Sequence, residues 1–201
     1  MPSDLFGLPQ PNPPFGRIVL GGRFAPVTLT GVAASAVYWE MAMGKLAQSG
    51  LPFFLRSNKI NLALWNPGIL SAPYALEFSA WGAGAGNAAN AITLTLQLGP
   101  DALSTITVIT AADAAATSWR WHVFLTPGPT FKQMAVDSLS FNSAGATVSS
   151  AVATLTTDDF AQQSLFLTNL TVQAGETLTI NGCLLELIPL IPVSIQDSVI
   201  G

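Results

Sequence analysis

Charged side chains are scarce in this sequence: lysine, arginine, aspartate and glutamate make up 9% of its 201 residues, against about 25% in an ordinary soluble domain. Hydrophobic residues account for 50%, and the formal net charge is -4. Disordered chains combine low hydrophobicity with high charge, the reverse of this composition. The seven cations are scattered from Arg17 to Lys132 without a run. Nucleic-acid binding needs a clustered basic surface, so we expect no nucleic-acid partner.

Cysteine and histidine occur once each, as Cys183 and His122. A lone cysteine excludes a disulfide framework. One histidine and one cysteine cannot form a zinc site without carboxylates, and no ligand spacing is present. We therefore predict no metal and no cofactor. Cys183 lies between Gly182 and Leu184 in an apolar run, which indicates a small buried side chain.

Long lipid-facing runs are also missing. Residues 78–100 are uncharged and long enough to span a bilayer, but Asn, Gln and Thr are interleaved with the apolar residues. That pattern is typical of strand, turn and strand, so we expect no membrane helix. The first 16 residues carry Asp4 and several prolines and show no basic segment before an apolar core, so we expect no signal peptide and assembly in the cytoplasm.

What the sequence does contain is a series of short β-like runs. The clearest is 91–98, where Ile and Leu alternate strictly with Thr and Gln, as in a half-buried strand. Eight or nine such runs recur at spacings of roughly 10–15 residues with turn residues between them. The sequence therefore predicts an all-β protein, an antiparallel β-sandwich.

The chain divides into four parts by composition. Residues 1–16 are rich in proline and predict an extended arm, and residues 17–57 hold N-terminal strands. Residues 58–190 form the β-sandwich domain, followed by a C-terminal tail, 191–201. We predict a short helix over 33–49 because Ala, Met, Glu and Lys favour one, although its Val-Tyr-Trp segment would equally open a strand.

Several runs in the sandwich region carry a family resemblance. They are PYALEFSAWG leading into a Gly/Ala/Asn turn, the alternating AITLTLQLG, the paired-tryptophan run SWRWHVFL, and QAGE followed by TLTINGCLLELI. Their order over residues 62–189 resembles jelly-roll-like structural proteins of tailed bacteriophage particles. The resemblance implies a jelly-roll-like fold.

The same resemblance implies a function and a location. Such proteins are virion parts, commonly homotrimers or higher assemblies, and they are not enzymes. We therefore expect a non-enzymatic virion subunit, foremost a capsid decoration or cement protein that self-associates and binds the major capsid protein or other virion proteins. The alternatives are a tail or head-fibre component, or a carbohydrate-binding β-sandwich module for host attachment.

Any Ser-His-Asp or Cys-His site would have to use His122 as its base. In a strand, Trp119, Trp121 and Val123 share one face, while Arg120, His122 and Phe124 share the other. Asp113 and Asp137 are candidate partners, but nothing in the sequence fixes them near His122. We predict a partly exposed or interface histidine and no catalytic residue.

Three further motifs have structural interpretations. The glycine run 81–87 precedes a strand rather than a helix, so we interpret it as a hairpin connection and not a phosphate loop. Asp158 and Asp159, beside Thr156 and Thr157, lack calcium-loop spacing and indicate a solvated loop. The sequon Asn169-Leu170-Thr171 falls in a predicted strand, so we treat it as chance.

The surroundings of the five tryptophans distinguish a packing role from a sugar-binding role. A sugar-binding module would expose at least one of them beside polar side chains, whereas apolar neighbours favour core or subunit-interface packing. We predict packing, foremost for residues 81, 119 and 121. The tryptophans are Trp39, Trp65, Trp81, Trp119 and Trp121.

Overall fold

The computed structural model describes residues 17–30, 37–41, 55–56, 59–60, 74–85, 91–101, 103, 105–114, 118–128, 130, 132–142, 145–154, 163–169 and 175–189. The predicted arm, 1–16, and tail, 191–201, lie outside these residues. Within them the elements are all strands, and the registered strand pairs are antiparallel. The predicted all-β class is confirmed.

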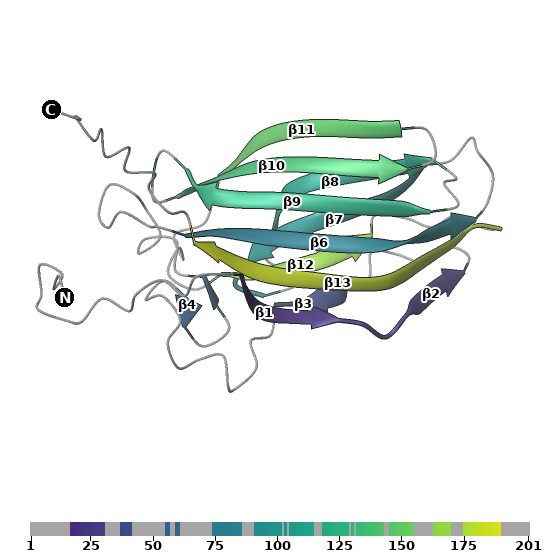
Figure 1. Ribbon diagram of the computed structural model, residues 1–201, viewed down its shortest axis with the longest axis horizontal. Coiled ribbons are helices and arrows are strands. Elements are labelled where there is room, and N and C mark those ends of the chain that lie inside the picture. Colours follow the sequence, from purple (N-terminus) through teal and green to yellow (C-terminus); the bar gives the residue numbers. More distant parts are fainter. Residues whose placement is uncertain are drawn as a thin grey trace, which may run out of the picture.

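The strands form two large sheets and a small ladder (Figure 1). The seven-stranded sheet runs in the order β1 (Ile18–Arg23), β13 (Thr177–Pro189), β6 (Tyr74–Ala85), β9 (Trp119–Pro127), β10 (Gln133–Asn142) and β11 (Gly145–Thr154), and β2 (Val27–Thr30) also pairs with β13. The four-stranded sheet has the order β3 (Val37–Glu40), β12 (Ser164–Asn169), β7 (Ala91–Gly99) and β8 (Ile106–Ala114). The ladder pairs β4 (Leu55–Arg56) with β5 (Lys59–Ile60).

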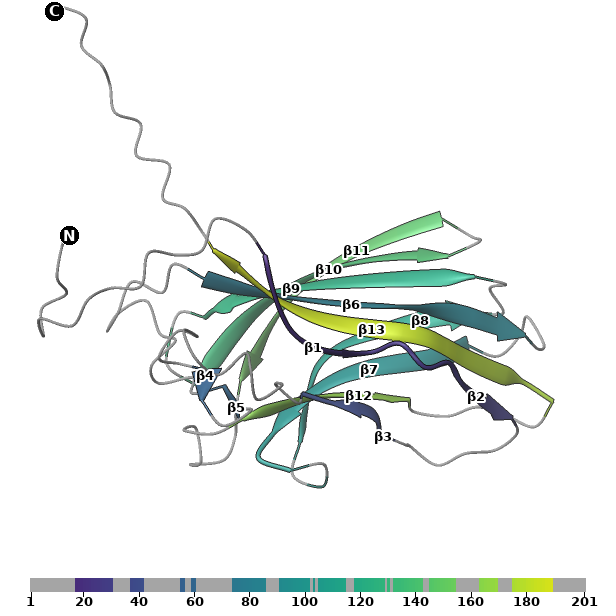
Figure 2. The same ribbon diagram turned by 60° about the horizontal axis from the view of Figure 1, so that its bottom comes forward.

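The two sheets face each other as the layers of a sandwich (Figure 2). Alternate residues of each strand point into the space between them. An aromatic chain crosses this core: the rings of Trp39 and Phe78 lie 5.4 Å apart, and those of Phe78 and Trp121 lie 6.3 Å apart, edge to face. Trp39 belongs to β3 of one sheet and the other two to the second sheet, so the chain joins the layers.

The predicted helix over 33–49 is wrong where the structure describes it. Residues 37–40 are β3, which pairs with β12 through Trp39 and Leu167. Trp39 is 7% exposed, so burial of its ring against the opposite sheet outweighs the helix propensity of its neighbours. The alternative, that Val37, Tyr38 and Trp39 open a strand, is confirmed.

The alternating run 91–98 is strand β7, as predicted. The expectation that its Thr face is open to solvent is wrong at the centre, because Thr95 is 0% exposed. Both faces of the neighbouring strand β12 are covered too, since Phe166 and Leu167 are each buried. The four-stranded sheet is therefore a covered layer at this point, and the outward face of the seven-stranded sheet is the more open surface.

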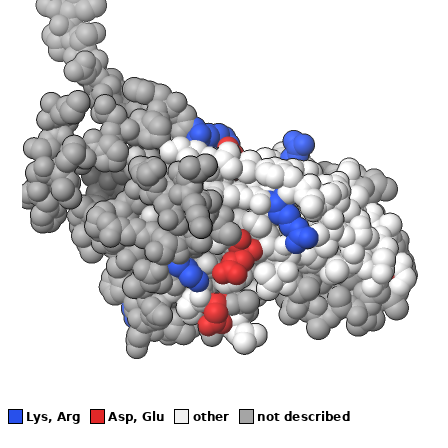
Figure 3. Space-filling model, turned by 90° about the horizontal axis from the view of Figure 1, so that it is seen from below, with Lys and Arg blue, Asp and Glu red and all other residues white. Residues whose placement is uncertain are grey.

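Few charged side chains lie on the described surface seen from below (Figure 3). Among the residues described in that view, those other than Lys, Arg, Asp and Glu make up most of the surface, as the composition predicts. No helix among the described segments is both long and apolar enough to cross a membrane.

Candidate functional site

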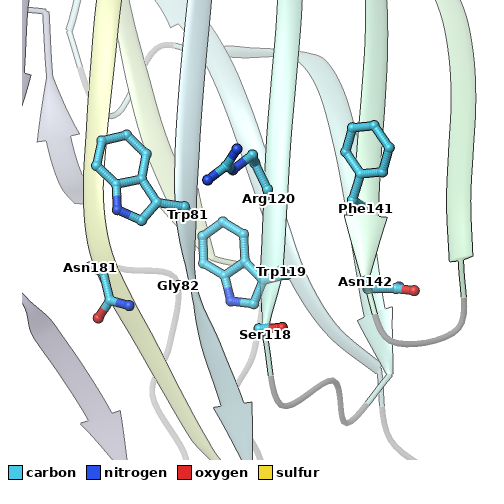
Figure 4. A pocket seen from close by; sticks show the side chains of 8 residues that line it. All are labelled: Trp81, Gly82, Ser118, Trp119, Arg120, Phe141, Asn142 and Asn181. Atoms are coloured by element: carbon cyan, nitrogen blue, oxygen red, sulfur yellow. The ribbon is translucent and has the colours of Figure 1, made fainter.

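An open depression of about 380 Å³ lies on the outward face of the seven-stranded sheet, toward one end of its strands (Figure 4). Pockets for small ligands usually start at roughly 300 Å³. Its lining combines aromatic, amide, hydroxyl and guanidinium groups. The lining residues are Trp81, Gly82, Ser118, Trp119, Arg120, Phe141, Asn142 and Asn181.

The centre of the depression is a row of three side chains on neighbouring strands. Trp81 of β6 pairs in register with Arg120 of β9, which pairs with Phe141 of β10. Residues that are directly opposite in adjacent strands project from the same face, and Figure 4 shows the three side chains side by side. The row places a guanidinium between an indole and a phenyl ring.

Trp81 is held flat by a glycine and a bulge in β13. The register between β6 and β13 shifts between Ile180 and Gly182. A Cβ added at Gly182 would lie 2.6 Å from Cζ2 of Trp81, so the indole rests directly on the backbone of β13. The bulge residue, Asn181, is exposed, and its amide lies at the rim of the depression. Phe24 approaches Trp81 at 6.3 Å between ring centroids.

Trp119 forms part of the floor. Its side chain points into the core and is 7% exposed. A Cβ on Gly82 would lie 2.6 Å from Cζ2 of Trp119 and would overlap the carbonyl oxygen of Thr179. Glycine at position 82 therefore lets the indole pass beneath β6.

Arg120 is exposed and has no hydrogen bond or ion pair with any described residue. Other cations of the described part are engaged. Arg23 donates to the carbonyl of Tyr38 at 2.8 Å, and Lys59 donates to that of Pro100 at 2.7 Å. The guanidinium of Arg120 is thus free to bind an anionic group at the centre of the aromatic row.

A second polar group lies on the same sheet face, beside the depression. Glu77 and Glu186 are opposite each other in register, and Arg17 contacts both, with 3.1 Å between its Nη1 and Oε2 of Glu186. The hydrogen bond to Glu186 and the charge of Glu77 raise the pKa of Arg17 above its usual value. Arg17 therefore offsets the repulsion between two adjacent carboxylates and fastens the start of β1 to the sheet.

His122 joins this polar group, and its predicted partial exposure is confirmed by a side chain that is 36% exposed. Its Nδ1 lies 3.1 Å from Oγ of Ser79 and 3.3 Å from Oε1 of Glu77. A catalytic relay needs the hydroxyl on one ring nitrogen and the acid on the other. Here both groups face the same nitrogen, so the three residues form a hydrogen-bond cluster without relay geometry.

Of the two aspartates considered as partners for His122, Asp137 lies on the neighbouring strand and the same sheet face, but its carboxylate bonds to the strand on the other side. The carboxylate of Asp137 accepts a hydrogen bond of 2.6 Å from Ser150. Asp113 belongs to β8 of the other sheet. Glu77 could not be predicted as a neighbour of His122, because their proximity depends on the register of β6 against β9.

Cys183 is buried, as predicted, at 1% exposure. Burial raises the pKa of its thiol to about 11. The thiolate is the reactive form, so the folded chain presents an inert cysteine.

We expect Cys183 to react with iodoacetamide much more slowly in the folded chain than in urea. At pH 8 a thiol of pKa about 11 is ionised to roughly one part in a thousand, against about a quarter for an ordinary thiol. Mass spectrometry of quenched samples measures the rate in each state. Equal rates in the folded and unfolded chain would contradict this assignment.

Other motifs have mixed outcomes. The glycine run 81–87 is only partly a connection, because residues 81–85 belong to β6, but a strand follows it, as predicted. Asp158, Asp159 and Trp65 lie outside the described residues, as does the side chain of Asn169. Among the residues described, no cluster of three or more His, Cys, Asp or Glu is placed to hold a metal.

The prediction of core or subunit-interface packing is confirmed in the core for Trp119 and Trp121, and Trp39 is buried there too. Trp81 is partly exposed, because the alternation of β6 turns it to the outward face. For Trp81 the core is therefore excluded, and packing against another subunit stays a prediction. Sequence reasoning also missed Phe141 and Asn181, although an Asn-Gly pair inside an apolar strand was a signal for the bulge.

No protein-family model matches this chain, and no curated protein sequence matches it. Solved structures with a similar arrangement include peanut lectin with a nine-residue peptide, at 5% identity and a TM-score of 0.38, covering 86% of this chain and 98% of the lectin. Arcelin-5, a lectin-like defence protein from Phaseolus vulgaris, has 7% identity and a TM-score of 0.38 over 87% of this chain and 98% of its own.

A third similar structure is the CBM2 module of an evolved Dit protein from Lactobacillus casei BL23 phage J-1. It has 8% identity and a TM-score of 0.36, covering 85% of this chain and 95% of the module. At this level of similarity, no ligand and no residue role transfers to the present chain.

Proposed function

We propose that this chain is a non-enzymatic β-sandwich module that binds an acidic saccharide in the depression around Arg120. The observation that carries the proposal is the row Trp81, Arg120 and Phe141, in which a guanidinium without a hydrogen bond or ion pair to any described residue lies between two aromatic rings. Aromatic rings offer flat apolar surfaces to the C–H faces of a sugar, and amides at the rim offer hydrogen bonds. This was the alternative function expected from the sequence.

Arg120 sets the class of saccharide. A guanidinium binds a carboxylate with two parallel hydrogen bonds. Asn181 at the bulge and Ser118 just before β9 line the same depression, and they would bind the hydroxyl groups of the sugar ring. A sugar with a carboxylate, such as a uronic acid, uses all of these groups, whereas a neutral sugar leaves the guanidinium unused.

Removing the charge of Arg120 is expected to weaken binding of the acidic sugar selectively. In Arg120→Gln, the affinity for a glucuronic-acid-terminated oligosaccharide should fall roughly ten- to a hundredfold, because hydrogen bonds to charged groups contribute about 1.5–3 kcal/mol. Titration calorimetry measures it against the glucose-terminated counterpart, whose weaker binding should change little.

Two further variants show whether the effect is specific to the position of Arg120. One removes a positive charge elsewhere on the same face, and the other removes an aromatic ring of the depression. Arg17→Gln removes the same charge from the same sheet face outside the depression and should leave the affinity unchanged. Trp81→Ala removes the stacking surface and should weaken both sugars. The proposal fails if a glycan array gives no acidic ligand, or if Arg120→Gln binds the acidic sugar as the wild type does.

The non-enzymatic part of the proposal is supported by His122, whose Nδ1 faces both Ser79 and Glu77. A subunit of a phage particle, foremost a capsid decoration protein, is a second candidate role and is compatible with sugar binding. It is supported by the sparse charge of the described surface and by exposed apolar residues on a sheet edge. Antibody labelling of intact particles tests it, and absence of the protein from them would refute it.

A further inference from the structure

Strand β11 is an open edge of the seven-stranded sheet. It pairs with β10 over the whole of 145–154 without a register shift, and it is the last strand in the sheet order (Figure 1). Within the described part of the chain no strand pairs with its other side. Alternate residues of such a strand direct backbone N–H and C=O groups away from the sheet.

This edge lacks the features that usually prevent pairing. Proteins protect edge strands with lysine, proline or bulges, yet the sequence of β11, GATVSSAVAT, has neither charge nor proline. Val148 and Val152 are 75% and 53% exposed. The opposite edge, β1, differs because it has a bulge between Val19 and Gly21 and ends in an arginine.

The exposed valines lie on the same face as the depression. Phe141 is opposite Ala146 in register, and side chains alternate along a strand. Residues 146, 148, 150 and 152 therefore share the outward face with Phe141. The edge thus presents valine, serine and valine at every second position.

We propose that β11 pairs antiparallel with β11 of a second copy of this chain, about a two-fold axis at Ser150. Residues that are opposite each other in a continuous sheet project from the same face. The even-numbered residues of β11 project outward, so each of them must lie opposite an even-numbered residue of the second copy. With the axis at Ser150, Val148 of each copy lies opposite Val152 of the other. β-Branched cross-strand pairs of this kind stabilise sheets.

Charge does not oppose a second copy at this edge, and the pairing of Val148 with Val152 about the two-fold axis makes the edge complementary to itself. The chain carries a net charge of -4, which repels another copy at most surfaces. β11 contributes no charge, and the hydrogen bond from Ser150 engages the carboxylate of Asp137 on the strand behind it. The edge is therefore a place where two copies meet without bringing like charges into contact.

The pairing makes a closed dimer, or the dimeric unit of an even-numbered assembly, in place of the trimer that the phage-protein resemblance implies. The two-fold axis runs perpendicular to the sheet, so both depressions face the same direction. This consequence rests on the proposed function: two sites on one face would bind a saccharide-coated surface with higher avidity than one.

The test is the mass of the full chain in solution, measured by light scattering after size exclusion. The wild type is expected at about 42 kDa, twice the chain mass of 21.0 kDa. The double variant Val148→Lys and Val152→Lys places lysines opposite each other and should be a monomer. The control Val19→Lys puts one such lysine on an exposed valine of the opposite edge and should remain a dimer.

A mixing experiment guards against misfolding of the lysine variant. A second double variant, Val148→Glu and Val152→Glu, should also be monomeric alone. Mixed with the lysine variant, it should form a heterodimer, because every introduced lysine then faces a glutamate. A monomeric or trimeric wild type, an unchanged mass in the lysine variant, or no heterodimer on mixing would each overturn the proposal.

Discussion

Replacing Trp121 with alanine is expected to lower the free energy of unfolding by about 3–5 kcal/mol, the usual cost of truncating a buried tryptophan. Trp121 is 1% exposed and meets Phe78 edge to face. Phe78 in turn contacts Trp39 of the opposite sheet. The alanine would leave a cavity in the middle of the aromatic chain that joins the two layers. Equilibrium urea unfolding followed by circular dichroism measures the loss.

Trp121→Phe is the matched variant. The indole Nε1 of Trp121 is buried and has no hydrogen-bond partner among the described residues, so phenylalanine loses part of a ring but no hydrogen bond. We expect a cost of about 1–2 kcal/mol. On the same strand, Arg120→Ala should change stability by no more than about 0.5 kcal/mol because the side chain is exposed. A loss below 1 kcal/mol in Trp121→Ala would show that this ring does not hold the layers together.

The class of fold and the inward face of several strands followed from local pattern. The alternation of Trp119, Trp121 and Val123 with polar residues predicted which side of β9 is buried, and these three side chains are indeed in the core. Period-two alternation is a property of a single segment, so it can be recognised without knowing which strands will pair with that segment.

What local pattern could not give was the covering of the sheets and the order of their strands. The alternating pattern predicts that Thr95 faces solvent, yet Thr95 is buried because its strand lies in a layer that is covered on both sides. Strand β13 pairs with β1 and β6, which precede it by about half the chain or more. The β3 segment also forms a strand only because β12, far along the chain, pairs with it.

The candidate site could not be predicted from the sequence for the same reason. Trp81, Arg120 and Phe141 are far apart in the chain and become neighbours only through the registers of β6, β9 and β10. A slip of one residue in either ladder would turn a member of the row into the core. The paired tryptophans of β9 were visible as a motif, but they form the buried side of that strand, and the ligand-binding candidate is the arginine between them.

Gly82→Ala is expected to lower the free energy of unfolding by as much as the truncation of a large core side chain does. Gly82 lies between Ile180 of β13 and Trp119 of β9 in register. The new Cβ would overlap the carbonyl of Thr179 and press on the indole of Trp119. Overpacking usually costs about 1–3 kcal/mol and more where backbone must move, so we expect about 3 kcal/mol or greater. Urea unfolding measures it, together with the intrinsic tryptophan fluorescence of the folded state.

The neighbouring substitution Ala83→Ser separates this steric effect from the general sensitivity of β6. Ala83 points to the outward face and is only partly buried, so its unfolding free energy should change by about 0.5 kcal/mol or less. Because Trp119 lines the depression, Gly82→Ala should also weaken saccharide binding even in buffer where the protein remains folded. A stable Gly82→Ala variant with unchanged binding would mean that β6 and β13 can separate without disturbing the site. In that case the floor of the depression would not depend on the close approach of these two strands.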